Sequence, residues 1–343
     1  MRRQRGRGSS VGFDTPYEDV TRDLITFRDW KAKPINANDR TSAWITARPK
    51  ALKALEKVIG RSAYVARLGV HTGGANAVFW VEVAGERRDK SLIVTNVLEG
   101  AKKKVDRTQA VVEPDLVYPL LRGANVSRWR AETEISMIVT HQPSMRLKAV
   151  PLEKMRVDFP KTLAYLKRFE SHLRRRASLR RYFKVDAPFY SIFNIGDYTF
   201  SPWKVVWREQ ADGLTAAVIG LRGRQPVIPD HKLMMVDIAS EEEAHYLCAA
   251  LNSSPARLVV SAYASEISMN THILKNLGIP SFSSTSVIHK TLATLSLAAH
   301  KASKAGVDEQ LQQVEVKVDQ WAAKLWALSN DELAGIQQSL REL

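Results

Sequence analysis

The stretch of residues 189–209, FYSIFNIGDYTFSPWKVVWRE, constrains the fold most strongly, because aromatic and β-branched residues crowd both sides of a Gly-Asp-Tyr turn. Such residues favour the pleated, half-buried surface of a sheet over a helix. The sequence therefore predicts paired strands across the turn. We expect their aromatic side chains to form the core of a sheet, with cationic residues at its margins.

Further apolar runs in the first 240 residues favour a mixed α/β body. A helix is predicted over residues 47–59, and an apolar stripe of Leu163, Leu166, Phe169 and Leu173 predicts helix within residues 152–176. Strands are predicted over residues 77–83, 92–98, 135–140, 190–193, 205–208, 214–219 and 232–238. Together these elements predict a mixed β-sheet with helices.

From Ser240 the pattern becomes helical. Ser240 with Glu243, and Ser329 with Glu332, have the spacing of capping boxes. Helices are predicted over residues 241–252, 256–264, 286–304, 308–328 and 331–343. We expect a polar, partly disordered lead-in over residues 1–45, a mixed α/β domain over residues 46–280, and a helical hairpin or bundle as a tail over residues 281–343.

The chain is strongly basic, with 51 Lys and Arg against 36 Asp and Glu in 343 residues, a formal net charge of +15. An excess of this size indicates a polyanionic partner such as nucleic acid, although it can also be a solvated surface. Charge alone does not separate DNA from RNA.

Cysteine content and hydropathy set the compartment we expect. The single cysteine, Cys248, excludes a disulfide scaffold and a cysteine-based zinc site, and fits a reducing cytoplasm. No apolar run approaches the roughly 18 residues of a membrane span, and the arginine-rich start lacks the apolar segment of a secretory signal. We therefore expect a cytoplasmic protein with no membrane partner.

No catalytic or metal-binding constellation emerges from the sequence. Gly-rich dinucleotide and phosphate loops are absent. The His231-Lys232 pair fails the spacing of a phospholipase-D-type nuclease, and Pro114-Asp115 and Pro229-Asp230 lack a nearby Glu-x-Lys for a metal-dependent one. Asp14-Thr15-Pro16-Tyr17 approaches the adenine-binding loop of DNA methyltransferases, but Thr15 replaces its first proline.

Five segments and the helical tail nevertheless resemble one family in their order and spacing. The chain is similar to the C-terminal specificity region of adenine-specific DNA methyltransferases and restriction-modification enzymes, the TaqI-like specificity domain. The resemblance covers most of residues 45–343, through residues 64–83, 117–129, 189–209, 227–252 and 276–282.

This resemblance implies a sequence-specific duplex DNA recognition module without its catalytic half. In the family a methyltransferase domain with S-adenosylmethionine precedes the specificity region, and this sequence starts where that domain would end. We therefore expect no cofactor in this chain, and S-adenosylmethionine in a partner methyltransferase subunit or domain. Two alternatives stay open: a degenerate or standalone methyltransferase or nuclease, and an RNA-binding or scaffold protein.

Cationic and polar residues near predicted turns and helix ends are the candidate DNA contacts. Lys and Arg supply phosphate contacts, whereas a few Arg, Asn or Gln side chains read base edges. The alternatives are a tight turn at Gly73-Gly74, a structural Trp129, and solvated arginines or a rim lysine. The candidates are Arg67, Thr72, Asn76, Arg122, Arg128, Arg174, Arg175, Arg176, Arg180, Arg181 and Lys204.

Overall fold

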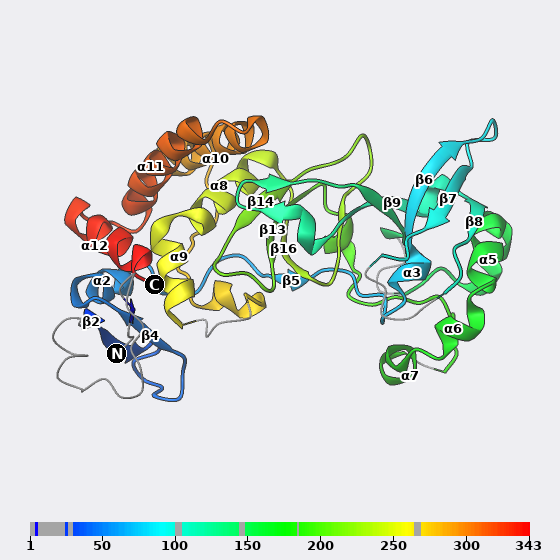
Figure 1. Cartoon of the computed structure of the whole chain (residues 1–343), viewed down its shortest axis with the longest axis horizontal. Helices are drawn as coiled ribbons and strands as arrows, with labels where there is room; N and C mark the ends of the chain where they lie inside the picture. Colours follow the sequence, from blue (N-terminus) through cyan, green and yellow to red (C-terminus); the bar gives the residue numbers. More distant parts are fainter. Residues whose placement is uncertain are drawn as a thin grey trace.

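The computed structural model describes residues 4–5, 25–26, 30–99, 105–143, 148–183, 185–263 and 269–343. The Asp14-Thr15-Pro16-Tyr17 motif lies outside these residues. The predicted mixed α/β class is confirmed. Two separate hydrophobic cores divide the molecule into two lobes that lie end to end (Figure 1).

The first unit, here called the sheet lobe, is built on a six-stranded sheet in the order β15–β9–β12–β6–β7–β8. All neighbouring strands are antiparallel except β15 and β9, which are parallel. The strands are β6 (Trp80–Glu86), β7 (Leu92–Asn96), β8 (Gln109–Val112), β9 (Val117–Leu121), β12 (Ile135–Ile138) and β15 (Ile228–Pro229). Its helices are α3 (Asn76–Phe79), α4 (Leu152–Asp158), α5 (Pro160–Lys167), α6 (Glu170–Arg174) and α7 (Ala177–Tyr182).

The second unit, here called the helical lobe, contains an antiparallel four-stranded sheet in the order β14–β13–β16–β5. These strands are β5 (Arg67–Leu68), β13 (Trp203–Arg208), β14 (Ala216–Ile219) and β16 (Leu233–Ile238). Its helices are α2 (Pro49–Ala54), α8 (Glu241–Asn252), α9 (Ser254–Tyr263), α10 (Val287–Ala305), α11 (Asp308–Leu325) and α12 (Asn330–Arg341). Three short antiparallel pairs complete the strands: β1 (Gln4–Arg5) with β2 (Ile25–Thr26), β3 (Lys31–Pro34) with β4 (Trp44–Ala47), and β10 (Val126–Ser127) with β11 (Arg130–Ala131).

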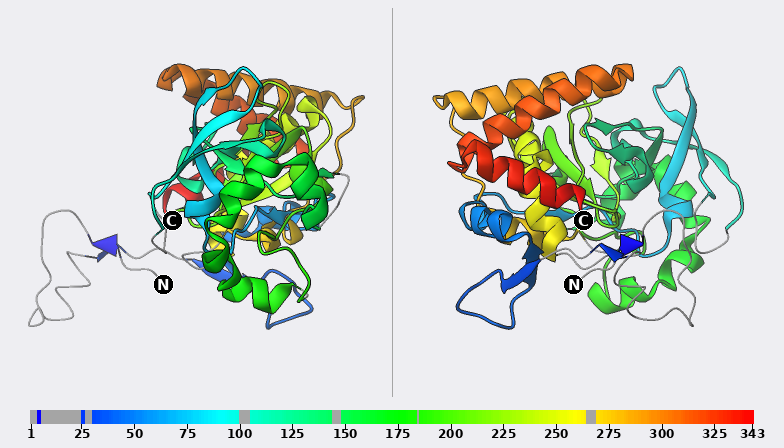
Figure 2. Two further views of the ribbon diagram at one scale, coloured as in Figure 1. Left: turned by 90° about the vertical axis from the view of Figure 1, so that its right-hand side faces the viewer. Right: turned by 60° about the vertical axis from the view of Figure 1, so that its left-hand side comes forward.

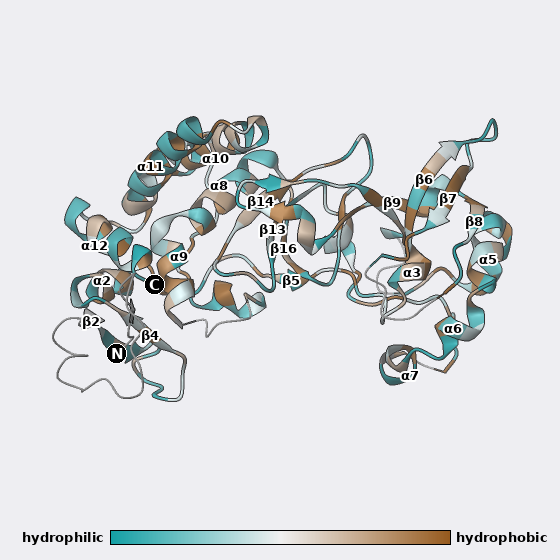
Figure 3. Cartoon of the chain, in the orientation of Figure 1, coloured by the Kyte–Doolittle hydropathy of each residue, from teal (hydrophilic) through white to brown (hydrophobic). Residues whose placement is uncertain are grey.

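The C-terminal helices belong to the core of the helical lobe. Helix α8 packs on β13 and β14, α10 packs on α8, and α11 packs on α10 (Figure 2). Val318 of α11 and Ile336 of α12 share one hydrophobic cluster with Trp207 of β13 and Leu247 of α8. Hydrophilic and hydrophobic residues alternate along α10 to α12, as in amphipathic helices (Figure 3). The boundary predicted at residue 280 therefore runs through a common core.

The chain passes between the two lobes several times. It leaves the helical lobe after β5, returns to the β10–β11 pair after β9, and re-enters the sheet lobe at β12. It crosses again to the helical lobe before β13. Between β14 and β16 it returns to the sheet lobe and forms β15. A third, small cluster that includes Leu121, Val206 and Leu233 joins residues of β9, β13 and β16. The lobes are thus joined by several chain segments and a common apolar contact.

Of the two strands predicted across residues 189–209, only the second is present. Residues 203–208 form β13, but residues 189–196 are irregular and a 3-10 turn follows at Asp197–Phe200. Both edges of β13 are already paired, with β14 and β16. The carbonyl oxygens of Phe189 and Tyr190 accept instead from Arg176 (2.7 Å) and Thr140 (2.9 Å). Side-chain donors therefore satisfy these two carbonyls, and Phe193 pairs with His71 through a single antiparallel β-bridge. Tyr190 and Trp207 are buried as expected.

Local signals account for most other boundaries. Helix α8 begins and ends as predicted, with the Ser240 hydroxyl accepting from the Glu243 N–H. Both hydrogen bonds of the predicted Ser329 capping box are present. The helical region at residues 152–176 is split into α4, α5 and α6, and Pro160 starts the second of these. The predicted strand at residues 77–83 begins three residues late, because residues 76–79 form α3.

Candidate nucleic-acid interface

Two clefts adjoin at the junction of the lobes. The first has a volume of about 460 Å³ and lies among Asn76, Arg122 and Lys232. The second, of about 630 Å³, lies among Arg128, Gly213 and Arg257. Arg208 and Gln210 line both clefts, so the two form one continuous surface that we call the junction groove.

Glycines allow the backbone to form the first cleft. A Cβ at position 69 would lie 2.1 Å from the Asp230 carbonyl oxygen, so only glycine permits the bridge between Val70 and Asp230. Gly73 and Gly74 have φ angles of +72° and +84°, a region that favours glycine. These positions let the loop of residues 71–76 lie against residues 229–232.

Histidine rings and one buried carboxyl group line this cleft. The His71 ring stacks on Phe193 and lies against His231, with ring centroids 4.4 Å apart in each pair. The Asp230 carboxylate accepts from the Lys232 N–H at 2.9 Å, and burial raises the pKa of Asp230 to about 6. The floor of the first cleft therefore changes charge near neutral pH.

The side chain of Asn76 places an amide N–H donor in the groove. Its side-chain oxygen accepts from the Thr72 hydroxyl at 2.5 Å. Within the described residues its amide nitrogen has no hydrogen-bond partner, and the residue lines the first cleft. This orientation leaves the amide group able to donate to a ligand.

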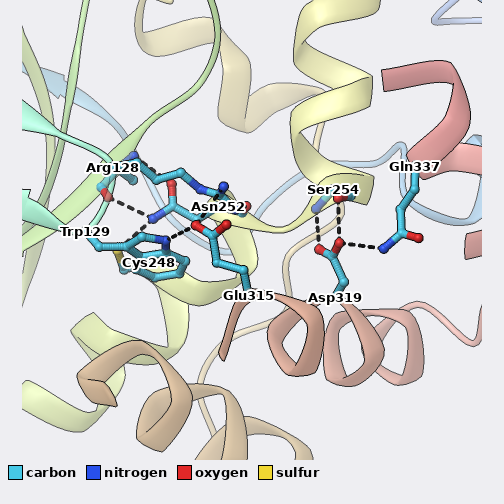
Figure 4. A network of polar contacts seen from close by, with 9 residues as sticks. Arg128, Trp129, Cys248, Asn252, Ser254, Glu315, Asp319 and Gln337 are labelled. Atoms are coloured by element: carbon cyan, nitrogen blue, oxygen red, sulfur yellow. Dashed lines mark hydrogen bonds and ion pairs between the residues drawn. The ribbon is translucent and has the colours of Figure 1, made fainter. Parts of the chain in front are cut away.

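The second cleft is bordered by the turn between β10 and β11, shown in Figure 4. Trp129 has a φ of +64°, unusual for a bulky residue, and its buried indole donates to Glu315 Oε1 at 2.7 Å. The Arg128 guanidinium forms an ion pair with the same oxygen at 2.7 Å and donates to the Asn252 carbonyl at 2.7 Å. Burial, and then the nearby charge of Arg257, lower the pKa of Arg128 to about 10. The turn is thus fixed to α11 and to the end of α8.

A second carboxylate of α11 fixes the start of α9. Asp319 accepts from the Ser254 N–H (2.7 Å), the Ser254 hydroxyl (2.6 Å) and the Gln337 amide (2.8 Å; Figure 4). Because Asp319 and Glu315 are one helical turn apart, a single face of α11 positions both Arg128 and α9.

Cations outnumber acids along the junction groove. Its walls carry Arg122, Arg128, Arg208, Lys232 and Arg257, against Glu99, Asp212 and Asp230. Arg122 is paired with Glu134 at 2.7 Å. In the part of the chain that the structure describes, the side chains of Arg208, Lys232 and Arg257 form no hydrogen bond or ion pair. These three cations are available to an anionic ligand.

Only part of the predicted contact set lies on this groove. Asn76, Arg122 and Arg128 line it. Arg67 lies elsewhere, over the Tyr198 ring and 3.5 Å from Asp237. Four others are exposed on α6, α7 and the turn between them: Arg174, Arg175, Arg180 and Arg181.

Three predicted contacts are buried and have structural roles. Arg176 is 1% exposed and donates to the carbonyls of Leu173, Thr72 and Phe189 at 2.9, 2.7 and 2.7 Å. Lys204, also 1% exposed, donates to the Ser201 carbonyl at 2.6 Å, and burial lowers its pKa to about 7. The buried Thr72 hydroxyl binds Asn76. These groups are therefore removed from the candidate surface.

Little in the sequence indicates that the additional groove residues lie together. Arg208 is the exposed last residue of β13, and Gln210 follows in the loop. In the sequence Lys232 stands beside His231, in a motif that fails the spacing of a phospholipase-D-type nuclease. Arg257 lies on α9 and meets Arg128 only in the folded chain. No local pattern identifies residues that come together in this way.

The described residues contain neither a metal-binding cluster nor a membrane-spanning helix. No three His, Cys, Asp or Glu side chains among them gather where they could hold a metal ion. None of the helices described here is long and apolar enough to cross a membrane.

Two solved structures of restriction-modification enzymes are partly similar to this chain. The type IIL enzyme MmeI, solved in complex with DNA, has a TM-score of 0.45 at 10% identity, covering 82% of this chain and 36% of its own. The type IIG restriction endonuclease BpuSI has a TM-score of 0.38 at 14% identity, covering 81% and 33%. No protein-family model matches the chain.

Sequence comparison finds one kind of enzyme, a type II methyltransferase. The chain is homologous to the type II methyltransferase M.NspV of Nostoc sp. (strain ATCC 29411 / PCC 7524), with 32% identity over 148 residues. This match covers 43% of the present chain and 29% of the methyltransferase. All three comparisons thus cover about a third of the relative's own length.

Proposed function

We propose that this chain is a sequence-specific duplex DNA recognition module of the TaqI-like specificity type, acting in a restriction-modification system. The observation that carries the proposal is the junction groove, where Arg208, Lys232 and Arg257 face an open surface without protein partners among the described residues. Homology to a type II methyltransferase supports the same assignment.

The groove contains groups for both tasks of a DNA-reading surface. Unpaired Arg and Lys side chains attract phosphates and set the register of the duplex. The carboxamides of Asn76 and Gln210 lie in the same groove, and a carboxamide can bind both N6 and N7 of adenine in the major groove. We assign Arg208 and Lys232 to backbone contacts, and Asn76 and Gln210 to base edges.

The chemistry of methyl transfer belongs, in this proposal, to a partner subunit or domain. That partner would hold S-adenosylmethionine and the adenine-binding loop, while this chain directs it to the recognised site. The absence of a glycine-rich cofactor loop in the sequence supports this division.

The proposal is tested by duplex binding of the full chain, measured by fluorescence anisotropy at several salt concentrations. Arg208→Gln and Lys232→Gln are each expected to weaken binding to all sequences and to lower the salt slope by about 0.9. Lys317→Gln, an equal charge change on the exposed face of α11, is the control and should leave both unchanged.

Gln210→Ala is expected to weaken binding to the recognised sequence selectively. Candidate sequences come from selection against a random duplex library. A salt-insensitive wild-type association, or tighter binding to duplex RNA, would overturn DNA recognition. Methyl transfer from labelled S-adenosylmethionine by the chain without a partner would overturn its role as a module.

A further inference from the structure

We infer that the second cleft holds a specific phosphodiester site, formed by Arg257 of α9 and Arg128 of the β10–β11 turn. This inference rests on the proposed DNA-binding function and deepens it, because it identifies one backbone contact on the helical lobe. Neither Arg257 nor this pairing is evident from the sequence, in which the two residues are 129 positions apart.

The first observation is the state of the two guanidinium groups. Arg257 Nε and Arg128 Nε are both buried, and neither has a hydrogen-bond acceptor within the described residues. Buried N–H groups in folded proteins are nearly always paired, so two such donors on one cleft require explanation. An anionic ligand would satisfy both.

The second observation is that the two cations lie close together. The charge of Arg257 is the main neighbouring charge that disfavours the protonated form of Arg128. Arg128 is balanced by Glu315, whereas Arg257 has no ion pair among the described side chains. Like charges so placed repel one another unless an anion lies between them.

The acidic groups nearby do not supply that anion. Glu315 Oε1 is shared by Arg128 and Trp129, and both oxygens of Asp319 are bound to Ser254 or Gln337. Asp212, on the wall of the cleft, is exposed and forms no ion pair with either arginine. Among the described residues, Arg257 is therefore a cation without an ion-pair partner.

The site is also held in position before any ligand arrives. Arg128 is fixed by Glu315 and the Asn252 carbonyl, and Asp319 anchors Ser254, three residues before Arg257 on the same helix. Fixing the Arg128 side chain and the helix that carries Arg257 in advance lowers the entropy lost on binding. A guanidinium presents several N–H donors in one plane, which matches the oxygens of a phosphodiester.

The test is the salt dependence of duplex binding by the full chain. Arg257→Gln is expected to lower the slope of log affinity against log salt by about 0.9, equally for recognised and random duplexes. Arg257→Lys keeps the charge and should keep the slope, while binding more weakly because an ammonium cannot form the planar fork. Lys317→Gln is again the control.

The outcomes separate this site from the broader proposal. If wild-type binding is salt-sensitive but Arg257→Gln keeps the slope of the control, the phosphodiester site is wrong and DNA recognition stands. If the wild type shows no salt-sensitive binding, both fail. Thermal unfolding by circular dichroism verifies that each variant is folded, and Arg257→Lys with wild-type affinity would also contradict the site.

Discussion

Arg176 offers a sharp test of the structure. The sequence predicts that it contacts phosphate, whereas in the fold it is buried and holds chain segments together by hydrogen bonds. Its guanidinium donates to three carbonyls: Leu173 near the end of α6, Thr72 in the loop of residues 71–76, and Phe189 in the irregular stretch. Burial lowers the pKa of Arg176 to about 10.

Arg176→Met keeps an apolar stem but removes all three hydrogen bonds. Bonds to a charged donor contribute about 1.5–3 kcal/mol each, and part of this loss is offset because a buried charge is also removed. We expect the free energy of unfolding to fall by about 3 kcal/mol. Unfolding in guanidinium chloride, followed by circular dichroism, measures the change.

The neighbouring Arg175 is the matched control. It is exposed and makes one hydrogen bond, to the Ser171 carbonyl, so Arg175→Met should alter stability by less than about 0.5 kcal/mol. The reasoning is refuted if Arg176→Met is as stable as this control while the salt slope of DNA binding falls by about 1. That result would mean that Arg176 reaches phosphate, as its position in the basic run suggests.

Three further predictions concern buried titratable groups. Asp230 has a pKa of about 6 in the folded chain against an ordinary 3.8, so stability should decline as pH rises from about 4 to about 6, and Asp230→Asn should remove that decline in denaturant titrations. Lys204 has a pKa of about 7 against an ordinary 10.5, so stability should decline as pH falls from about 10 to about 7; a profile that stays equally steep in Lys204→Met would contradict this cause. Burial raises the pKa of Cys248, so an aromatic disulfide reagent at pH about 8 should react with it only after unfolding, and rapid reaction of the native chain would show that the thiol is accessible.

The sequence predicts elements well where the signal is local. Ser240 and Ser329 mark the starts of α8 and α12 because an N-cap acts within three residues of itself. Residues 189–196 fail as a strand because a strand needs a free neighbouring edge, and β13 has none left. The carbonyls of Phe189 and Tyr190 are bound instead by Arg176 and Thr140, which no local pattern reveals.

The same limit applies to the site. Arg175 and Arg176 are adjacent in a basic run, yet one is exposed and the other buried, because a helix end turns successive side chains in different directions. Arg128 was predicted from its turn, whereas its partner Arg257 comes from a helix that only the shared core brings close. Charge predicts the class of partner, and packing decides which charges face it.

The repeated passage of the chain between the lobes has a mechanical consequence. Domain closure normally turns on a few hinge residues at one or two connections, whose backbone angles absorb the motion. Here several segments cross the same junction, and the cluster around Val206 and Leu233 packs within it. Opening would disrupt all of these at once, so we expect the groove to keep its width. Under the proposed function, a duplex in the groove would have to adapt its own shape, and bending energies of about 1–6 kcal/mol would favour deformable sequences at base pairs that the protein never touches.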